Sequence, residues 1–169
     1  MLGFVIFAAG PLLASLYFSF TQYNIVKPAQ FVGLANYAQL FTTDQQMRQS
    51  LGVTLYYAAL TIPLSLALSL LVAVLLNQPV RWIALYRTVW YLPVLVPAVA
   101  TGTLWRWVLN TDFGLVNWPL KLLGLPAPGW LTDPAFTVPS LVLIALWGIG
   151  GTTLIFLAGL QGVPQSLLE

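Results

Sequence analysis

The chain has 169 residues, of which 59% are hydrophobic and 6% are charged, with a net charge of +2. Ordinary soluble domains contain about 25% charged residues, and the six basic and four acidic side chains here cannot cover a soluble surface. The composition therefore indicates an integral membrane protein. The absence of Cys and His excludes disulfides and the usual zinc ligands, and the scattered basic residues do not favour nucleic-acid binding.

Four stretches are long and apolar enough to form transmembrane helices, which need roughly 20 mainly apolar residues. They cover about residues 1–20, 53–76, 86–109 and 138–161. No basic residue precedes Leu2, so we expect the first stretch to be a membrane helix and not a cleaved signal peptide. The predicted fold is an all-α bundle of four transmembrane helices with both ends on one side of the membrane.

The two longer loops also contain ordered structure by their sequence pattern. Apolar and aromatic residues recur at helical spacing within residues 27–41, which predicts a short interfacial helix. Residues 113–134 are instead rich in turn-forming residues, namely Gly114, Asn117, Pro126, Pro128, Gly129, Asp133 and Pro134.

Basic residues suggest an orientation. The short connection 77–87 contains Arg81 and Arg87, whereas the longer loops 21–50 and 110–136 have a lower density of positive charge. Because cytoplasmic loops carry an excess of Lys and Arg, we expect residues 77–87 and both ends of the chain to be cytoplasmic.

Three prolines lie inside the predicted spans: Pro63, Pro93 and Pro97. Each removes a backbone donor and bends or loosens its helix. The freed carbonyl groups must bond to neighbouring helices or to water in a cavity. Pro93 and Pro97 are therefore candidates for the wall of a translocation pathway, although proline is also common in membrane helices that only pack together.

Arg106 is the one charged residue near the interior of a predicted span, and Trp105 precedes it. An ionisable group at this depth can contact a polar solute in a pathway. Alternatively, Arg106 lies at the outer end of its helix and extends to the interface. Gln161 is open to the same two interpretations, as a pathway residue or as the start of an inner loop.

Several chemical motifs are absent from the sequence. There is no G-x-x-x-x-G-K-[ST] loop for nucleotide phosphates, no pair of carboxylates within the spans, and no Ser in a nucleophile elbow. These absences do not favour an enzyme or a proton-coupled transporter.

Six segments in chain order resemble motifs of the permease subunits of binding-protein-dependent ABC importers, in the carbohydrate-type branch that includes maltose and glycerol-phosphate systems. They are SLYFSFTQYN (15–24), FVGLANYAQLF (31–41), LLVAVLLNQ (70–78), YRTVWYLPVLVPAVATGTLWRWVLNTDFGLVN (86–117), WLTDP (130–134) and FLAGLQGVPQSLLE (156–169).

The resemblance implies the type I importer fold in a bacterial inner membrane, surrounded by membrane lipid. It also implies three protein partners: a second permease subunit, cytoplasmic ATPase subunits and a periplasmic or lipid-anchored solute-binding protein. ATP and Mg would bind to the ATPase subunits, so no cofactor is expected on this chain. The chain is expected to be a transporter subunit and not an enzyme.

The end of the chain resembles the start of the loop through which such permeases contact their ATPase. Glu169 resembles the first residue of the E-A-A motif of that loop, and Gln161, Gly162 and Pro164 lead into it. The chain is therefore expected to be an N-terminal fragment.

Two domains are predicted. Residues 1–50 hold the first helix and a periplasmic loop with its interfacial helix. Residues 51–169 hold an incomplete transmembrane domain with the other three helices, cut at the start of the coupling loop.

The functional hypothesis is a permease subunit for ATP-driven uptake of a sugar or a related polyol-like solute. Four residues are candidates for the pathway wall: Pro93, Pro97, Trp105 and Arg106. The alternatives are a membrane scaffold and a channel bundle without ATP coupling.

Overall fold

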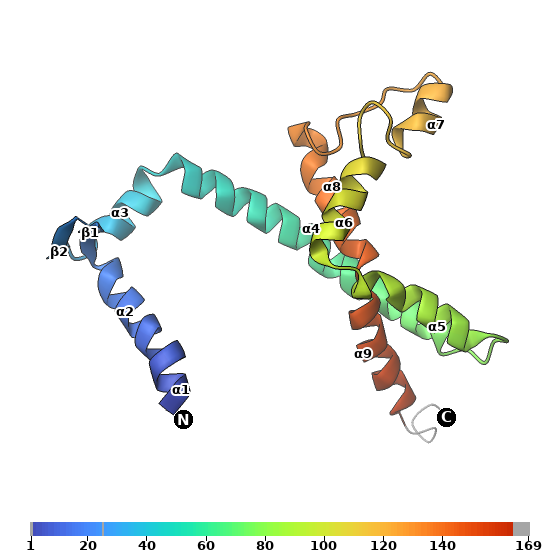
Figure 1. Ribbon diagram of the computed structural model, residues 1–169, viewed down its shortest axis with the longest axis horizontal. Helices are drawn as coiled ribbons and strands as arrows, with labels where there is room; N and C mark the ends of the chain where they lie inside the picture. The colour runs from blue at the N-terminus through green and yellow to red at the C-terminus, as the bar shows by residue number, and fades with distance from the viewer. Residues whose placement is uncertain (1, 25, 164–169) are drawn as a thin grey trace. The chain divides into compact units, whose positions relative to one another are not determined.

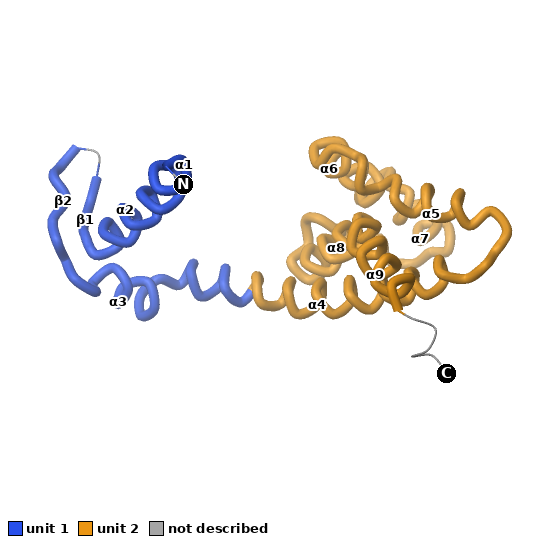
Figure 2. Tube along the Cα trace, turned by 90° about the horizontal axis from the view of Figure 1, so that it is seen from below, with its two compact units in different colours: residues 1–52 blue, residues 53–169 orange. Residues whose placement is uncertain are grey.

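Helices form most of the chain in the computed structural model, which describes residues 2–24 and 26–163 (Figure 1). The chain divides into two compact units, residues 1–52 and residues 53–169 (Figure 2). Helix α4 begins in the first unit and continues into the second.

The first apolar stretch forms a helix from Leu2 to Ser19, close to the predicted bounds of 1–20. Pro11 cannot donate a helical hydrogen bond, and just before it the Gly10 N–H bonds to the Val5 carbonyl, the wider spacing of a π-helical turn. No residue of this helix is buried, so its apolar faces require lipid or further protein. Its segments are α1 (Leu2–Phe4), the π-helical η1 (Val5–Ala9) and α2 (Gly10–Ser19).

A β-hairpin follows this helix, which corrects the all-α prediction. Strand β1 (Thr21–Asn24) pairs antiparallel with β2 (Lys27–Phe31). The Lys27 N–H donates a hydrogen bond to Asn24 Oδ1 at 2.7 Å, so the asparagine side chain stabilises the reversal of the chain. The helix predicted over residues 27–41 is therefore wrong over the residues of β2.

Helix α3 (Ala35–Thr42) is the part of that predicted helix that forms, and polar side chains tie it to the end of the first helix. The Asn36 amide donates to the carbonyls of Ser19 and Thr21, both at 2.9 Å. The Tyr37 hydroxyl donates to Ser19 Oγ at 2.7 Å. The first two sequence motifs thus contact each other in space.

Helix α4 (Gln45–Leu76) begins about two turns before the predicted start of its span, 53–76. The reason is Asp44, whose Oδ1 accepts a hydrogen bond from the Met47 N–H at 2.9 Å, as a helix N-cap does. The first turns are polar, so hydropathy alone does not reveal them. Pro63 lies inside α4 without ending it.

The last two predicted spans are bent pairs of helices rather than single straight helices. Residues 83–108 form two arms that meet at an angle of 98°, and residues 134–161 form two helices that meet at 49°. Their segments are α5 (Ile83–Tyr91), the 3₁₀ turn η2 (Leu92–Leu95), α6 (Ala98–Val108), α8 (Pro134–Trp147) and α9 (Gly150–Gln161). The short helix α7 (Asn117–Leu122) lies in the loop between the two broken helices.

These breaks bear on the number of membrane spans. Within the described residues, two helices are long and apolar enough to cross a membrane by themselves, namely Leu2–Ser19 and Gln45–Leu76. The number rises to four only if each bent pair crosses as one span. The four-helix bundle therefore stays a prediction, whereas a mostly helical chain with membrane-compatible helices is established.

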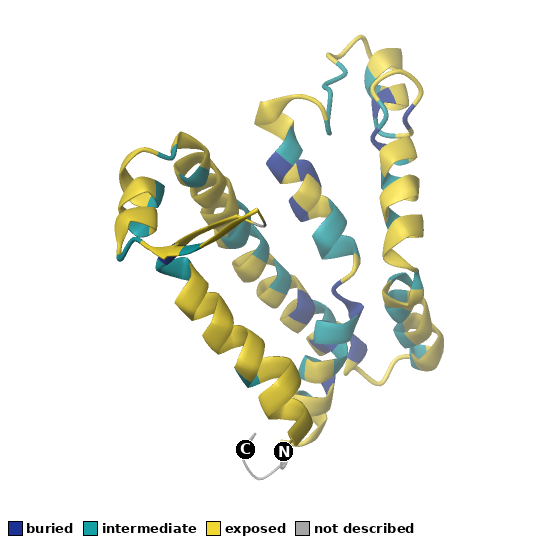
Figure 3. Ribbon diagram, turned by 60° about the vertical axis from the view of Figure 1, so that its left-hand side comes forward, coloured by how far each residue is buried: buried dark blue, intermediate teal, exposed yellow. Residues whose placement is uncertain are grey.

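A small core joins α4, α5 and α9 in the second unit. Ala73 and Leu76 of α4 and Leu157 of α9 are buried together, and Trp90 of α5 packs against them. Elsewhere most large apolar side chains are exposed, as the predominance of yellow in Figure 3 shows. Because water does not favour apolar surface on this scale, these faces are suited to lipid or to other protein segments.

Candidate functional site

Two prolines produce the break in residues 83–108. A residue that precedes proline is disfavoured in the helical conformation, and Val96 is accordingly extended with a ψ of 126°. Pro97 then caps α6 with a ψ of 142°. Pro93 lies near the start of the 3₁₀ turn η2. The kink expected at this pair of prolines is thus the 98° bend between α5 and α6.

The α5 arm is held in place by polar contacts. Arg87 donates from Nε and Nη2 to the carbonyl of Leu76, at 3.2 and 2.8 Å. Because Leu76 ends α4, the guanidinium satisfies a free carbonyl and interacts favourably with the negative end of the helix dipole. Further along α5, the indole Nε1 of Trp90 donates to Oγ1 of the buried Thr153 at 3.0 Å.

Gly150 allows α9 to approach α5 and η2 closely. A Cβ atom at this position would lie 2.9 Å from the Trp90 carbonyl oxygen and 3.2 Å from the Tyr91 Cα. Backbone atoms cannot give way as a flexible side chain can, so only glycine fits here without displacing α9. Gly150 is buried, whereas the adjacent Gly151 has no atom within 4 Å of its own Cβ position.

Pro93 lines a cavity of about 380 Å³ beside this junction. The cavity is mainly apolar, and its other lining residues are Leu76, Tyr86, Val89, Trp90, Leu146 and Trp147. Pro97 is exposed and does not line this cavity. The two prolines therefore act at one bend in the backbone but do not share one cavity.

Trp105 and Arg106 lie together in a second cavity, of about 520 Å³, which we call the Arg106 cleft. The cleft lies between the C-terminal part of α6, the segment just before α8 and the second half of α8, and the Trp105 ring contacts Trp147 edge-on at 5.9 Å. Its other lining residues are Gly102, Leu109, Asn110, Thr111, Leu131, Thr132, Leu141 and Ile144. The cleft thus combines an apolar wall with one cation and three neutral polar side chains.

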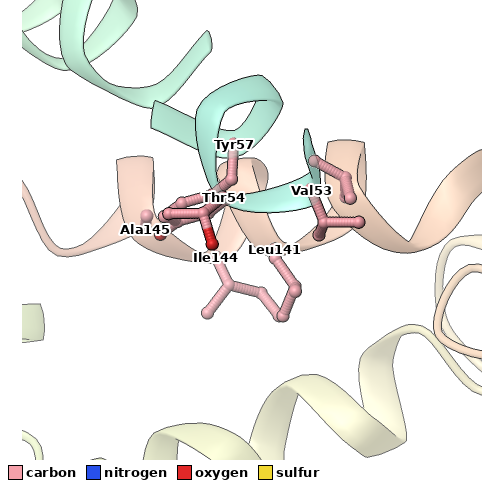
Figure 4. A pocket seen from close by; sticks show the side chains of 7 residues that line it. Val53, Thr54, Tyr57, Leu141, Ile144 and Ala145 are labelled. Carbon is pink, nitrogen blue, oxygen red and sulfur yellow. The ribbon is translucent and has the colours of Figure 1, made fainter. Parts of the chain in front are cut away.

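An apolar groove of about 420 Å³ runs between α4 and α8 (Figure 4). Tyr57 and Val53 line it from α4, and Leu141 and Ile144 line it from α8. Among its lining residues none is charged, so the groove suits another apolar segment or lipid tails better than a polar solute.

The loop between α6 and α8 is organised around a fully buried asparagine, Asn117. Its amide nitrogen donates to the carbonyls of Thr111 and Pro128 at 3.2 and 3.1 Å. Its Oδ1 accepts a hydrogen bond from the indole Nε1 of Trp130 at 2.8 Å. Motif order and turn propensity identify Asn117 and Trp130 in the sequence, but neither predicts that the Asn117 side chain joins the two halves of the loop.

Gly114 is a second residue that the loop requires. A Cβ at Gly114 would lie 2.2 Å from the Asn110 carbonyl oxygen and 2.7 Å from that of Val108. The spacing of Gly114 and Asn117 within one motif was the available signal, because glycine and asparagine mark turns. Hydropathy does not reveal which polar side chain is buried.

The residues predicted for the coupling loop are only partly described. Gln161 ends α9 and is exposed, and Gly162 caps the helix with hydrogen bonds from its N–H to the carbonyls of Ala158 and Gly159. A Cβ at Gly162 would meet no atom nearer than 3.5 Å, so the backbone does not require glycine there. Pro164 and Glu169 lie outside the described residues, and their roles stay predictions.

No metal site is evident within residues 2–24 and 26–163, since no group of three or more Asp and Glu side chains could hold an ion there. Binding of ATP and Mg to other subunits stays a prediction.

No protein-family model matches the chain. The probable ABC transporter permease protein YesP of Bacillus subtilis is 37% identical, with 100% of this chain and 55% of that protein covered. The diacetylchitobiose uptake system permease protein NgcF of Streptomyces coelicolor is 30% identical, with 98% and 51% covered. The trehalose/maltose transport system permease protein MalF of Thermococcus litoralis is 28% identical, with 98% and 56% covered.

The chain spans about half the length of the curated relatives it matches. Among solved structures, a chain of a bacterial alginate ABC transporter, in complex with an alginate pentasaccharide-bound periplasmic protein, matches with a TM-score of 0.85. The match covers 99% of this chain and 56% of that chain at 22% identity. At this level of identity the likeness concerns the fold.

Proposed function

Because this chain is homologous along its whole length to permeases of ABC transporters, we propose that it forms part of a permease subunit for ATP-driven sugar uptake. The solute in this proposal is a sugar or a related polyol-like molecule, since relatives are named for diacetylchitobiose and for trehalose and maltose. The match of the whole of this chain to about half the length of known permeases is the observation that carries the proposal.

The proposal also concerns partners and location. The chain would lie in the cell membrane with residues 77–87 on the cytoplasmic side, beside a second permease subunit. A solute-binding protein would deliver the sugar from outside. ATP would bind to separate cytoplasmic subunits, and residues from Gln161 to Glu169 would lead into the loop that contacts them. Such transporters alternate access by movements of packed helices, with the energy supplied by another subunit.

Uptake of labelled sugars tests this proposal. Cells that lack the gene for this chain should lose uptake of at least one sugar, and the full-length gene should restore it. Uptake should also be lost when the co-purifying ATPase carries an alanine in place of its phosphate-binding lysine. Uptake that survives this ATPase variant would support a channel instead, and unchanged uptake of every sugar would contradict the proposal.

The bend between α5 and α6 supports a pathway role for Pro93 and Pro97. The double variant Pro93→Ala, Pro97→Ala restores two backbone donors and removes the restriction on Val96, so we expect the arms to straighten. Since the chain has no Cys, spin labels on cysteines at Leu85 and Leu104, both exposed, can report the distance between the arms. We expect a longer distance and reduced sugar uptake.

Pro63→Ala is the matched control, because Pro63 lies in an unbroken helix. This variant should keep both uptake and the distance between the labels. An unchanged distance in the double variant would show that the prolines do not cause the break. A longer distance with full uptake would show that the bend does not serve transport.

A further inference from the structure

The Arg106 cleft contains hydrogen-bond donors that the described part of the chain leaves without acceptors. The guanidinium of Arg106 is exposed and makes no ion pair or hydrogen bond with any described residue. The indole Nε1 of Trp105 also lacks a partner there, although this atom is buried behind the ring that lines the cleft. A buried donor without an acceptor lowers stability, so such a group in a native structure calls for an explanation.

Asn110 adds a third donor, whose orientation is set by the backbone. Its Oδ1 accepts hydrogen bonds from the N–H groups of Asp112 and Phe113, at 2.8 and 3.2 Å. Because these bonds occupy the oxygen, the amide NH₂ is the end of the side chain that remains to bind a ligand. The cleft therefore offers donors mainly, and an incoming molecule must supply acceptor oxygens.

The charge of the cleft favours an anionic acceptor. Arg106 is the only charged residue among those that line the cleft. Two carboxylates flank the lining residues in the sequence, Asp112 after Thr111 and Asp133 after Thr132. Asp133 caps α8 by accepting a hydrogen bond from the Ala135 N–H at 2.9 Å, and among the described residues neither carboxylate forms an ion pair with Arg106. A guanidinium without a carboxylate partner binds carboxylate or phosphate oxygens through two parallel hydrogen bonds.

The apolar wall and the size of the cleft restrict the rest of the ligand. The Trp105 ring, Leu109 and Ile144 offer apolar surface next to the donors. A volume of about 520 Å³ lies within the range of small-molecule sites, about 300–1,000 Å³. A sugar ring has an apolar face and a rim of hydroxyl groups, and so matches this combination.

We propose that the Arg106 cleft binds a carbohydrate that carries one anionic group, a carboxylate or a phosphate. Arg106 pairs with the anionic group, Asn110 donates to a ring or hydroxyl oxygen, and the apolar wall covers one face of the sugar ring. This inference rests on the proposed sugar uptake and narrows its substrate class to acidic sugars.

Protection of an engineered cysteine from a thiol reagent tests the proposal. The chain has no Cys, so Thr132→Cys introduces a single thiol at the cleft. Gln78→Cys is the control, because it introduces a single thiol at an exposed turn that does not line the cleft. The full-length protein in lipid nanodiscs is labelled with and without glucuronate, glucose 6-phosphate or uncharged glucose. We expect either anionic sugar to slow labelling at position 132 several-fold, with no effect of glucose and no effect at position 78.

Arg106 variants show whether the guanidinium is responsible. In the Thr132→Cys background, Arg106→Gln should raise the sugar concentration for half-protection about tenfold or more, and Arg106→Lys should raise it less. Comparison of glucuronate with glucose 6-phosphate identifies the preferred anionic group. Equal protection by glucose, absence of protection, or protection that survives Arg106→Gln would overturn the proposal.

These outcomes are separable from the proposed function. If a neutral sugar is taken up in an ATP-dependent manner while position 132 remains unprotected, sugar uptake stands and the acidic-sugar cleft is wrong. If no sugar is taken up, the proposed function itself fails. A thermal unfolding curve of Arg106→Gln shows that the variant is folded when its protection is measured.

Discussion

Replacement of Asn117 by leucine should lower the free energy of unfolding by about 3 kcal/mol or more, because it removes both donors and the acceptor from a buried site. Leucine has a similar volume, but it leaves the carbonyls of Thr111 and Pro128 and the indole N–H of Trp130 without their partner. These three hydrogen bonds are part-buried, so each partner left alone should cost about 1 kcal/mol, the lower end of the range of about 1–3 kcal/mol for buried polar groups.

The measurement is unfolding of the full-length protein in mixed micelles with increasing SDS, followed by circular dichroism. Trp130→Phe removes only one of the three hydrogen bonds of Asn117 and should have a smaller effect. Asn77→Leu is the matched control, since Asn77 is exposed and its side chain makes no hydrogen bond within the described chain. Its effect should stay within about 0.5 kcal/mol. Equal stability of the Asn117 and Asn77 variants would contradict the role of Asn117 in the loop.

Gly150→Ala should destabilise the protein by about 1–3 kcal/mol, even though alanine favours helices more than glycine does. The added Cβ would lie 2.9 Å from the Trp90 carbonyl oxygen, so α9 must move away from α5. That movement would also lengthen the hydrogen bond between Trp90 and Thr153, now 3.0 Å. The intensity and emission maximum of Trp fluorescence should change together with the free energy of unfolding, because Trp90 lies at this contact.

Gly151→Ala is the control for this variant. Both glycines lie in the first turn of α9, so their change in helix propensity is nearly the same, but Gly151 has open space at its Cβ position. Gly151→Ala should be neutral or slightly stabilising. If Gly150→Ala is equally well tolerated, α9 and α5 do not depend on this close approach.

The sequence determined the class of protein and the bounds of its first apolar helix. A composition with only 6% charged residues indicates a membrane protein, because charge and hydropathy are properties of the whole chain and do not depend on how it folds. The order of six motifs likewise predicted the relationship to ABC permeases, which the curated relatives confirm. Asp44 could have predicted the early start of α4, because Asp is a common N-cap residue. The predicted boundary instead followed the apolar run.

The tertiary structure decided which residues meet. Hydropathy treats residues 86–109 as one apolar run, because it measures transfer of side chains and does not record that Pro93 and Pro97 turn the backbone by 98°. The burial of Asn117, the need for glycine at position 150, and the cleft that residues 131–144 form beside Trp105 and Arg106 depend on segments distant in sequence. Composition and periodicity describe each segment alone, whereas such contacts exist only after the chain has brought two segments together.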